Sequence, residues 1–111
     1  MNISIKATHV DLTPSVKEYV EEKVGSLAKF IDIMEAKVEL KRDQHHQTGL
    51  VFGSDITLII GGKTMHAESE AEDIYAAIDL LVPKIKDQIE KFKDKKTSLW
   101  RRAARLFKGK M

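Results

Sequence analysis

The residues of this chain that could do chemistry are histidines and carboxylates, and their spacing predicts no catalytic site. His45 and His46 are adjacent in a polar stretch, a poor arrangement for metal ligands, so we favour a solvated loop there. Four carboxylates gather near one predicted helix start: Glu70, Glu72, Asp73 and Asp79. Capping and the helix dipole explain that position without a magnesium ion. We therefore expect a protein that is not an enzyme and needs no cofactor or metal.

The chain contains no cysteine, which excludes a thiol nucleophile, Cys-ligated zinc and a disulfide framework. Its start has no basic segment followed by an apolar stretch, and no apolar run approaches the ~20 residues that cross a bilayer. We therefore expect a cytoplasmic protein without a membrane partner.

Basic residues are more informative, because they concentrate at one end of the chain. Residues 1–83 carry eight Lys/Arg and fourteen Asp/Glu, a net charge of −6. Residues 84–111 carry eleven Lys/Arg and three Asp/Glu, a net charge of +8. Such asymmetry indicates a polyanionic partner at the basic end. A solvated helix followed by a basic tail that keeps the protein soluble explains the asymmetry equally well.

The lysines at this end follow helical spacing. One row is formed by Lys84, Gln88, Lys91 and Lys95, and Lys86 and Lys93 form a neighbouring row. A cationic ridge of this kind can follow a phosphate backbone. Three acidic residues, Asp87, Glu90 and Asp94, are spaced to pair with these lysines, but the charge excess survives that pairing. We therefore favour binding of a nucleic acid.

The last residues, 97–111, form a basic tail that contains Trp100, Phe107 and the arginines Arg101, Arg102 and Arg105. A helix here would place apolar and basic side chains on different faces. Such a segment suits stacking on unpaired bases, an rRNA groove or an anionic membrane. A disordered tail that adds nonspecific charge is the alternative, and RNA contact and disorder stay open.

These residues need secondary structure to position them, and the first half of the chain predicts two strands and a helix. Residues 2–7 alternate between apolar and polar, as in a half-buried strand. Thr13-Pro14 is a helix start, and a stripe of apolar residues predicts a helix of about 17 residues. That stripe consists of Val16, Val20, Val24, Leu27 and Ile31. Alternation around Val38 and Leu40 predicts the second strand.

The second half predicts a hairpin and a long helix. Residues 52–60 form a strand, Gly61-Gly62 supplies the positive φ angles of a two-residue turn, and the partner strand follows. Ser69 and Glu72 fit a capping box at the start of a helix that runs to about Lys96. Pro83 predicts a kink in it.

The resulting order is β-α-β-β-β-α, an α+β fold. At 111 residues and 42% apolar composition the chain fits one domain, which we place at residues 1–96 with the basic tail at 97–111. A sheet with one apolar face needs a covering layer, so we expect four strands with both helices packed on one face. The other sheet face is more polar and should face water.

Near the start of the second helix the sequence resembles a known family. The segment 73–79, Asp-Ile-Tyr-Ala-Ala-Ile-Asp, preceded by His66-Ala67-Glu68, resembles the second-helix signature of the ribosome hibernation promoting factor and ribosome-associated inhibitor family. The similarity extends to Asn2-Ile3, residues 12–23 and the lysine row of the last helix. It covers roughly residues 1–96.

The resemblance implies a fold similar to double-stranded RNA-binding domains and a site in the small ribosomal subunit, between head and body. There the protein would occupy the place of messenger RNA and of A- and P-site transfer RNA, blocking initiation in idle ribosomes. Lys23, Lys29, Lys84, Lys91 and Lys95 match the family positions that face rRNA. We add Lys86 from its row and Arg101, Arg102 and Arg105 from the tail. Tyr75 and Asp79 match the signature, and we assign them to packing and helix placement.

Two positions depart from the family, which often has lysine at Ser26 and arginine at Asp87. Both departures remove positive charge from the expected RNA face, so the arginine-rich tail should carry more of the affinity. Pro83 is also unusual for the family and could re-aim the lysine ridge. We expect a short form without the second domain through which long members pair ribosomes, which leaves open whether this chain supports ribosome dimers.

Two other functions compete with binding of the small ribosomal subunit. One is a protein-binding regulator of transcription, because the family has been labelled as modulating an alternative sigma factor. The other is a general double-stranded RNA binder with no preference for the decoding channel. No small-molecule substrate is expected in any of these readings.

Overall fold

The computed structural model describes residues 1–44 and 48–108 of the chain, with side chains described as far as Asp94. It confirms the predicted β-α-β-β-β-α order. The elements are β1 (Asn2–Thr8), α1 (Pro14–Gly25), a 3₁₀ turn η1 (Ser26–Lys29), β2 (Glu35–Arg42), β3 (Phe52–Ile60), β4 (Lys63–Ala71) and α2 (Ile74–Lys108).

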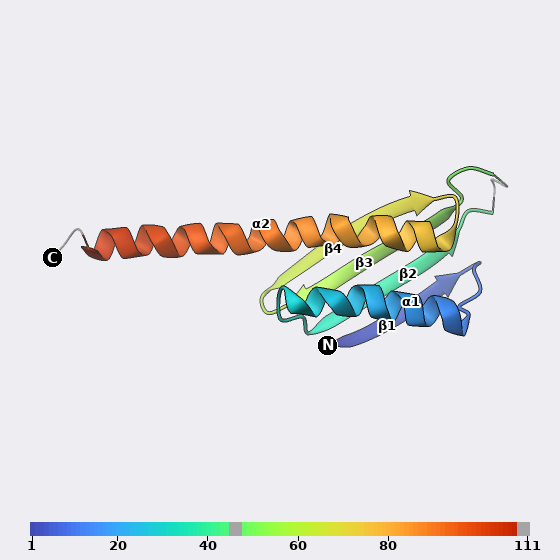
Figure 1. Cartoon of the computed structure of the whole chain (residues 1–111), viewed down its shortest axis with the longest axis horizontal. Helices are drawn as coiled ribbons and strands as arrows, with labels where there is room; N and C mark the ends of the chain where they lie inside the picture. The colour runs from blue at the N-terminus through green and yellow to red at the C-terminus, as the bar shows by residue number, and fades with distance from the viewer. Residues whose placement is uncertain (45–47, 109–111) are drawn as a thin grey trace.

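The four strands form one mixed sheet in the order β1-β2-β3-β4. β1 and β2 pair in parallel, whereas β2–β3 and β3–β4 are antiparallel. A parallel pair needs a crossover connection, and α1 supplies it. Both helices lie on the same face of the sheet, as predicted, and α2 extends well beyond the end of the strands (Figure 1).

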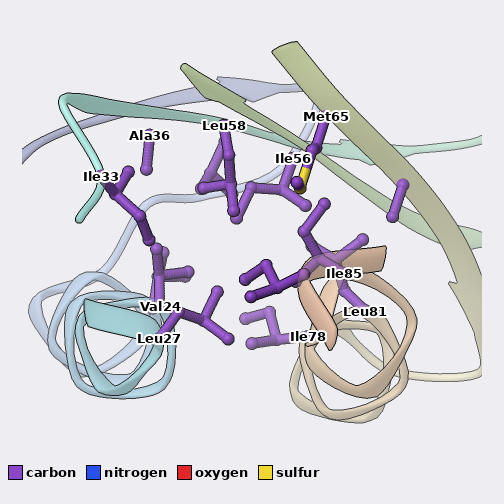
Figure 2. Packing of buried hydrophobic residues seen from close by; sticks show 14 of the residues in the cluster. Val24, Leu27, Ile33, Ala36, Ile56, Leu58, Met65, Ile78, Leu81 and Ile85 are labelled. Atoms are coloured by element: carbon purple, nitrogen blue, oxygen red, sulfur yellow. The ribbon is translucent and has the colours of Figure 1, made fainter. Parts of the chain in front are cut away.

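The core lies between the sheet and the two helices. Figure 2 shows side chains of both helices pointing at the inner face of the sheet: Val24, Leu27, Ile78, Leu81 and Ile85 against Ala36, Ile56, Leu58 and Met65. Ile56, Leu58 and Ile85 are fully buried. On the outer face, charged residues such as Lys6, Glu39 and Lys41 form a chain of ion pairs, so that face meets water as predicted.

The first helix begins as predicted and ends earlier. The Thr13 hydroxyl accepts a hydrogen bond from the Val16 N–H at 3.2 Å, and Pro14 occupies the first turn. The α-helix stops at Gly25 and tightens into η1, where the Ser26 hydroxyl donates to the Lys23 carbonyl at 2.6 Å. The tighter turn keeps Leu27 in the core but takes the chain off the 3.6-residue period.

The predicted capping box of α2 is wrong. Ser69 belongs to β4 and is buried, and the helix begins only at Ile74. Its cap is Asp73, whose carboxylate accepts a hydrogen bond from the Ala76 N–H at 2.8 Å. The period-two strand pattern continues through Ser69 and competes successfully with the capping signal.

Ser69 instead joins the sheet to α2. Its hydroxyl lies 2.7 Å from the Ser54 hydroxyl on β3, and both hydroxyls approach the Ala77 carbonyl of α2, Ser54 at 3.0 Å. Each hydroxyl has one proton, so the three groups share two hydrogen bonds. All are buried, so these bonds hold the first turns of α2 at a defined position on β3 and β4.

The remaining differences concern turns and the length of α2. Of the two glycines between β3 and β4, only Gly62 has a positive φ, 76°. α2 continues through Pro83 to Lys108, beyond the predicted end at Lys96, and Figure 1 shows it as one rod without a sharp bend. Pro83 is exposed, so water can reach the carbonyl that its missing N–H leaves free.

Substitution of the capping residue tests whether α2 begins directly after Asp73. Asp73→Ala should lower the free energy of unfolding by about 1 kcal/mol, because it removes the acceptor of the Ala76 N–H. Glu72→Ala removes the same charge from the same helix end and should cost clearly less. Denaturant unfolding of both variants measures the difference. If Glu72→Ala lowered the free energy of unfolding more than Asp73→Ala does, the capping box would be supported and the Asp73 cap would be contradicted.

Candidate nucleic-acid interface

The predicted lysine ridge of α2 is divided between two sides of the helix. Lys84 lies over the β4 side, where its ammonium donates to the Glu68 carbonyl at 2.8 Å. Gln88, one turn later, donates from its amide to the His66 carbonyl at 2.6 Å. β4 is an edge strand of the sheet. Lys84 and Gln88 therefore satisfy strand carbonyls that would otherwise offer an open edge to other chains.

Lys86 lies on the other side of α2 and faces the end of the first helical segment. Its ammonium is 4.6 Å from the centre of the Phe30 ring. The two predicted rows, that of Lys84 and that of Lys86, are therefore not neighbours. They lie on opposite flanks of α2, and the solvent-facing side between them carries the exposed carboxylates Asp87 and Glu90. A helical step of 100° per residue places 84 and 86 about 200° apart, so they cannot form one ridge.

Aromatic and charged side chains link α1 to α2. The Tyr19 hydroxyl donates a hydrogen bond to the Asp79 carboxylate, and the Tyr19 and Tyr75 rings meet edge to face with centres 5.0 Å apart. The Lys23 ammonium lies 5.4 Å from the Tyr19 ring centre. The roles expected for Tyr75 and Asp79 in packing and helix placement agree with these contacts.

The hydrogen bond to Asp79 raises the pKa of the Tyr19 phenol to about 12, with smaller contributions from partial burial and the negative charge. The bond needs a neutral phenol and an ionised carboxylate. Because the pKa is raised in the folded state, its contribution to stability is complete below about pH 10 and is lost as the pH rises through about 12.

The other predicted lysines differ in how free their charges are. Lys91 pairs with Asp87 at 2.9 Å on the surface of α2. Pairing therefore does dilute the lysine charge at this position, as the alternative interpretation of the sequence proposed. Lys29 is exposed at the end of η1, directly before Phe30, whose ring Lys86 contacts. The structure thus brings Lys23, Lys29 and Lys86 to the helical layer and turns Lys84 toward β4.

The side chains of Lys95, Arg101, Arg102 and Arg105 lie outside the described residues. Their sequence charge is nevertheless clear: residues 95–111 hold seven Lys/Arg and no acid, a net charge of +7. Residues 1–94 hold twelve basic and seventeen acidic residues, a net charge of −5. Figure 1 shows α2, which ends at Lys108, extending away from the sheet. The positive excess therefore belongs to residues 95–111 and not to residues 1–94.

The histidines and carboxylates are the other residues that could do chemistry. No group of three or more His, Asp or Glu among them could hold a metal ion. His66 stands on the outer sheet face between the Thr57 hydroxyl of β3, at 3.0 Å, and the Glu68 carboxylate of β4, at 3.1 Å, and these contacts join the two strands on an exposed surface. His45 and His46 lie outside the described residues. Within the described part of α1 and α2, neither helix is long and apolar enough to cross a membrane.

Sequence reasoning missed one basic residue of this region. Lys63, directly after the glycine turn, holds its ammonium 5.0 Å from the Phe92 ring centre on α2. It lies 28 positions before Lys91 in the chain, so no helical or strand period connects the two. The glycine turn marks Lys63 as a hairpin residue but does not indicate which helix passes the hairpin.

The Tyr19–Asp79 bond predicts a measurable titration. In a Tyr75→Phe background Tyr19 is the only remaining tyrosine. Replacing Asp79 by Asn there should lower the pH midpoint of phenolate formation from about 12 toward 10, because the amide oxygen carries no charge. The phenolate absorbance in the ultraviolet measures it. Asp87→Asn, on the same helix, should leave the midpoint unchanged. If the pH midpoint of phenolate formation were the same with and without the Asp79 carboxylate, the Tyr19–Asp79 hydrogen bond would be contradicted.

Comparison with known proteins agrees with the resemblance. The family model described as Sigma 54 modulation protein / S30EA ribosomal protein matches residues 3–97. The ribosome hibernation promoting factor of Escherichia coli K12 is 36% identical over 96 residues, which is 86% of this chain and 96% of that protein. The protein of the same name from Pseudomonas putida KT2440 is 35% identical over 105 residues, 94% of this chain and 98% of that protein.

Solved structures share the fold. The N-terminal domain of Thermus thermophilus Protein Y superposes with a TM-score of 0.70 at 29% identity, over 83% of this chain and 99% of that one. A ribosomal subunit interface protein from Coxiella burnetii superposes with a TM-score of 0.73 at 25% identity, over 85% and 99%. Sequence signature, fold and identity over most of the length agree, so the chain belongs to the Sigma 54 modulation protein / S30EA ribosomal protein family.

Proposed function

We propose that this protein is a ribosome hibernation factor that acts in the cytoplasm by binding rRNA of the small subunit in the decoding channel. Bound there, it excludes messenger RNA and A- and P-site transfer RNA and so keeps idle ribosomes inactive. The mechanism is steric and needs no catalytic group. The observation that carries the proposal is the division of charge between residues 1–94, with a net charge of −5, and residues 95–111, with a net charge of +7.

Charge of this distribution suits a highly charged RNA assembly. Seven cations without a carboxylate among them attract phosphate, and their binding releases condensed counterions. The acidic body is repelled by the same phosphates, so approach is oriented, with the basic end leading. Names of the relatives specify the ribosome as the polyanion: they are called ribosome hibernation promoting factors and a ribosomal subunit interface protein.

We assign the rRNA contacts to three groups of cations. They are the helical-layer lysines Lys23, Lys29 and Lys86, the lysines of the predicted row, Lys84, Lys91 and Lys95, and the terminal arginines Arg101, Arg102 and Arg105. Lys84 has a second role at the edge of β4, because its ammonium already donates to the Glu68 carbonyl. Its substitution will therefore affect the fold as well as binding.

A second candidate function is regulation of a transcription factor, because the family description also names sigma 54 modulation. It requires a protein surface as partner, so association would resist RNase. A general double-stranded RNA binder would bind naked duplexes as tightly as intact subunits. If the protein binds ribosomes, RNase should destroy the association, and naked RNA duplexes should compete only weakly with subunits for the protein.

The decisive measurement is co-sedimentation of the purified protein with small subunits, alone and after loading with messenger RNA and initiator transfer RNA. Saturable binding that the two ligands prevent is the expected result, because they would occupy the same channel. Binding that persists beside both ligands would contradict the steric mechanism. Failure to bind subunits at moderate salt would favour the transcription regulator, which a purified sigma factor then tests directly.

Shortening the helix tests where the affinity resides. A chain ending at Lys96 loses five of its basic residues but no residue of the core cluster, which ends at Ile89 and Phe92. Its affinity for subunits should fall, and the dependence of log K on log salt should become shallower by as much as about 4. A full-length control, Arg101→Gln with Arg102→Gln and Arg105→Gln, should reproduce most of that loss. Unchanged affinity in both would exclude residues 97–111 from the interface.

A further inference from the structure

A shallow recess lies between the β3–β4 hairpin and the side of α2. It is lined by Lys63, Thr64, Met65, Gln88, Lys91 and Phe92. Figure 1 shows the place: α2 passes the β3–β4 hairpin there and continues beyond the sheet. The recess therefore stands at the base of the projecting basic helix.

The lining of this recess is unusual among the surface hollows of the described residues. Its charged lining residues are the two lysines, Lys63 and Lys91. Four other hollows are each lined by at least one carboxylate, for example Glu70 beside β3 and β4, or Glu21 and Glu22 on α1. Asp87 pairs with Lys91 from outside the recess, so Lys63 contributes most of the positive charge to a hollow whose lining has no carboxylate.

Lys63 is held in position before any ligand arrives. It is the first residue of β4 and pairs with Ile60 across the turn, where Gly62 takes its positive φ. Its ammonium rests 5.0 Å from the centre of the Phe92 ring, a cation–π contact that keeps the exposed side chain against α2. A lysine already restricted in this way loses less conformational entropy on binding than a free one.

Further donors of the recess are only partly used. The Gln88 amide nitrogen donates one N–H to the His66 carbonyl and has a second. The Lys91 side chain is 77% exposed, and its bond to Asp87 uses one of three N–H donors. Phosphate oxygens are the acceptors that such a set of ammonium and amide donors matches.

We propose that this recess binds a backbone phosphate of RNA between Lys63 and Lys91, and that the hairpin thereby belongs to the interface. The inference rests on the proposed function and extends it to a second element of the fold. Met65 and Phe92 form the apolar floor and exclude water on one side, which strengthens the attraction of the two ammonium groups for the phosphate. RNA that follows the basic helix meets the hairpin end of the sheet next.

Lys63→Gln provides the test, because it removes the charge from an exposed side chain and leaves the core untouched. Affinity for small subunits should fall roughly five- to tenfold and the salt dependence should become shallower by about 1, as for one lost phosphate contact. Lys63→Arg keeps the charge and the contact with Phe92 and should retain binding. Lys37→Gln, an exposed lysine on β2, is the matched control and should bind as the parent does.

Acetylation of lysines, read by mass spectrometry with and without subunits, gives an independent result: Lys63 should be protected and Lys37 should not. If the parent protein binds subunits and Lys63→Gln binds with the same affinity and salt dependence, the phosphate site in the recess is contradicted. The proposed function is not affected by that result. A parent protein that does not bind subunits would overturn the proposed function, and this inference with it.

Discussion

The rotation of α2 about its own axis decides which of its side chains meet the sheet, which meet α1 and which face solvent. Two interactions set it: the buried contact of Ser54 and Ser69 with the Ala77 carbonyl, and the apolar stripe that enters the core at Ile78 and Ile85. The serine contact is directional and the stripe is not, so the serines select one rotation among those the stripe tolerates. Each later residue of a continuous helix then has its direction determined.

From that rotation follows the distribution of the lysines. Two residues that are two positions apart point to nearly opposite sides of a helix. Lys84 therefore reaches a β4 carbonyl, whereas Lys86 reaches the Phe30 ring. The side between them faces solvent with Asp87 and Glu90. Positive charge on α2 therefore flanks the helix along the sheet, and the outer ridge is acidic until Asp94. After Asp94 the sequence holds basic residues and no carboxylate, so residues 95–111 carry positive charge alone.

The strands were predictable because each buries one face, so burial and sequence alternate together, as in residues 52–60. The pairing of the strands was not predictable from the sequence, because no pattern in residues 2–7 indicates that β1 lies parallel to β2. The capping box failed because Ser69 satisfies a strand pattern and a cap pattern equally, and only the position of β3 decides between them. Lys84 and Lys63 were misjudged or missed for the same reason, since their partners, Glu68 and Phe92, come from other elements.

An acidic body with a basic extension differs physically from a uniformly basic RNA-binding domain. A uniformly basic surface is attracted to any phosphate at any orientation, which favours nonspecific binding. An approach with the wrong end first would bring residues 1–94, with a net charge of −5, against phosphates of like charge, and that repulsion opposes the wrong partner as well as the wrong orientation. In the proposed RNA binding, the carboxylates of the body would therefore contribute to specificity by repulsion.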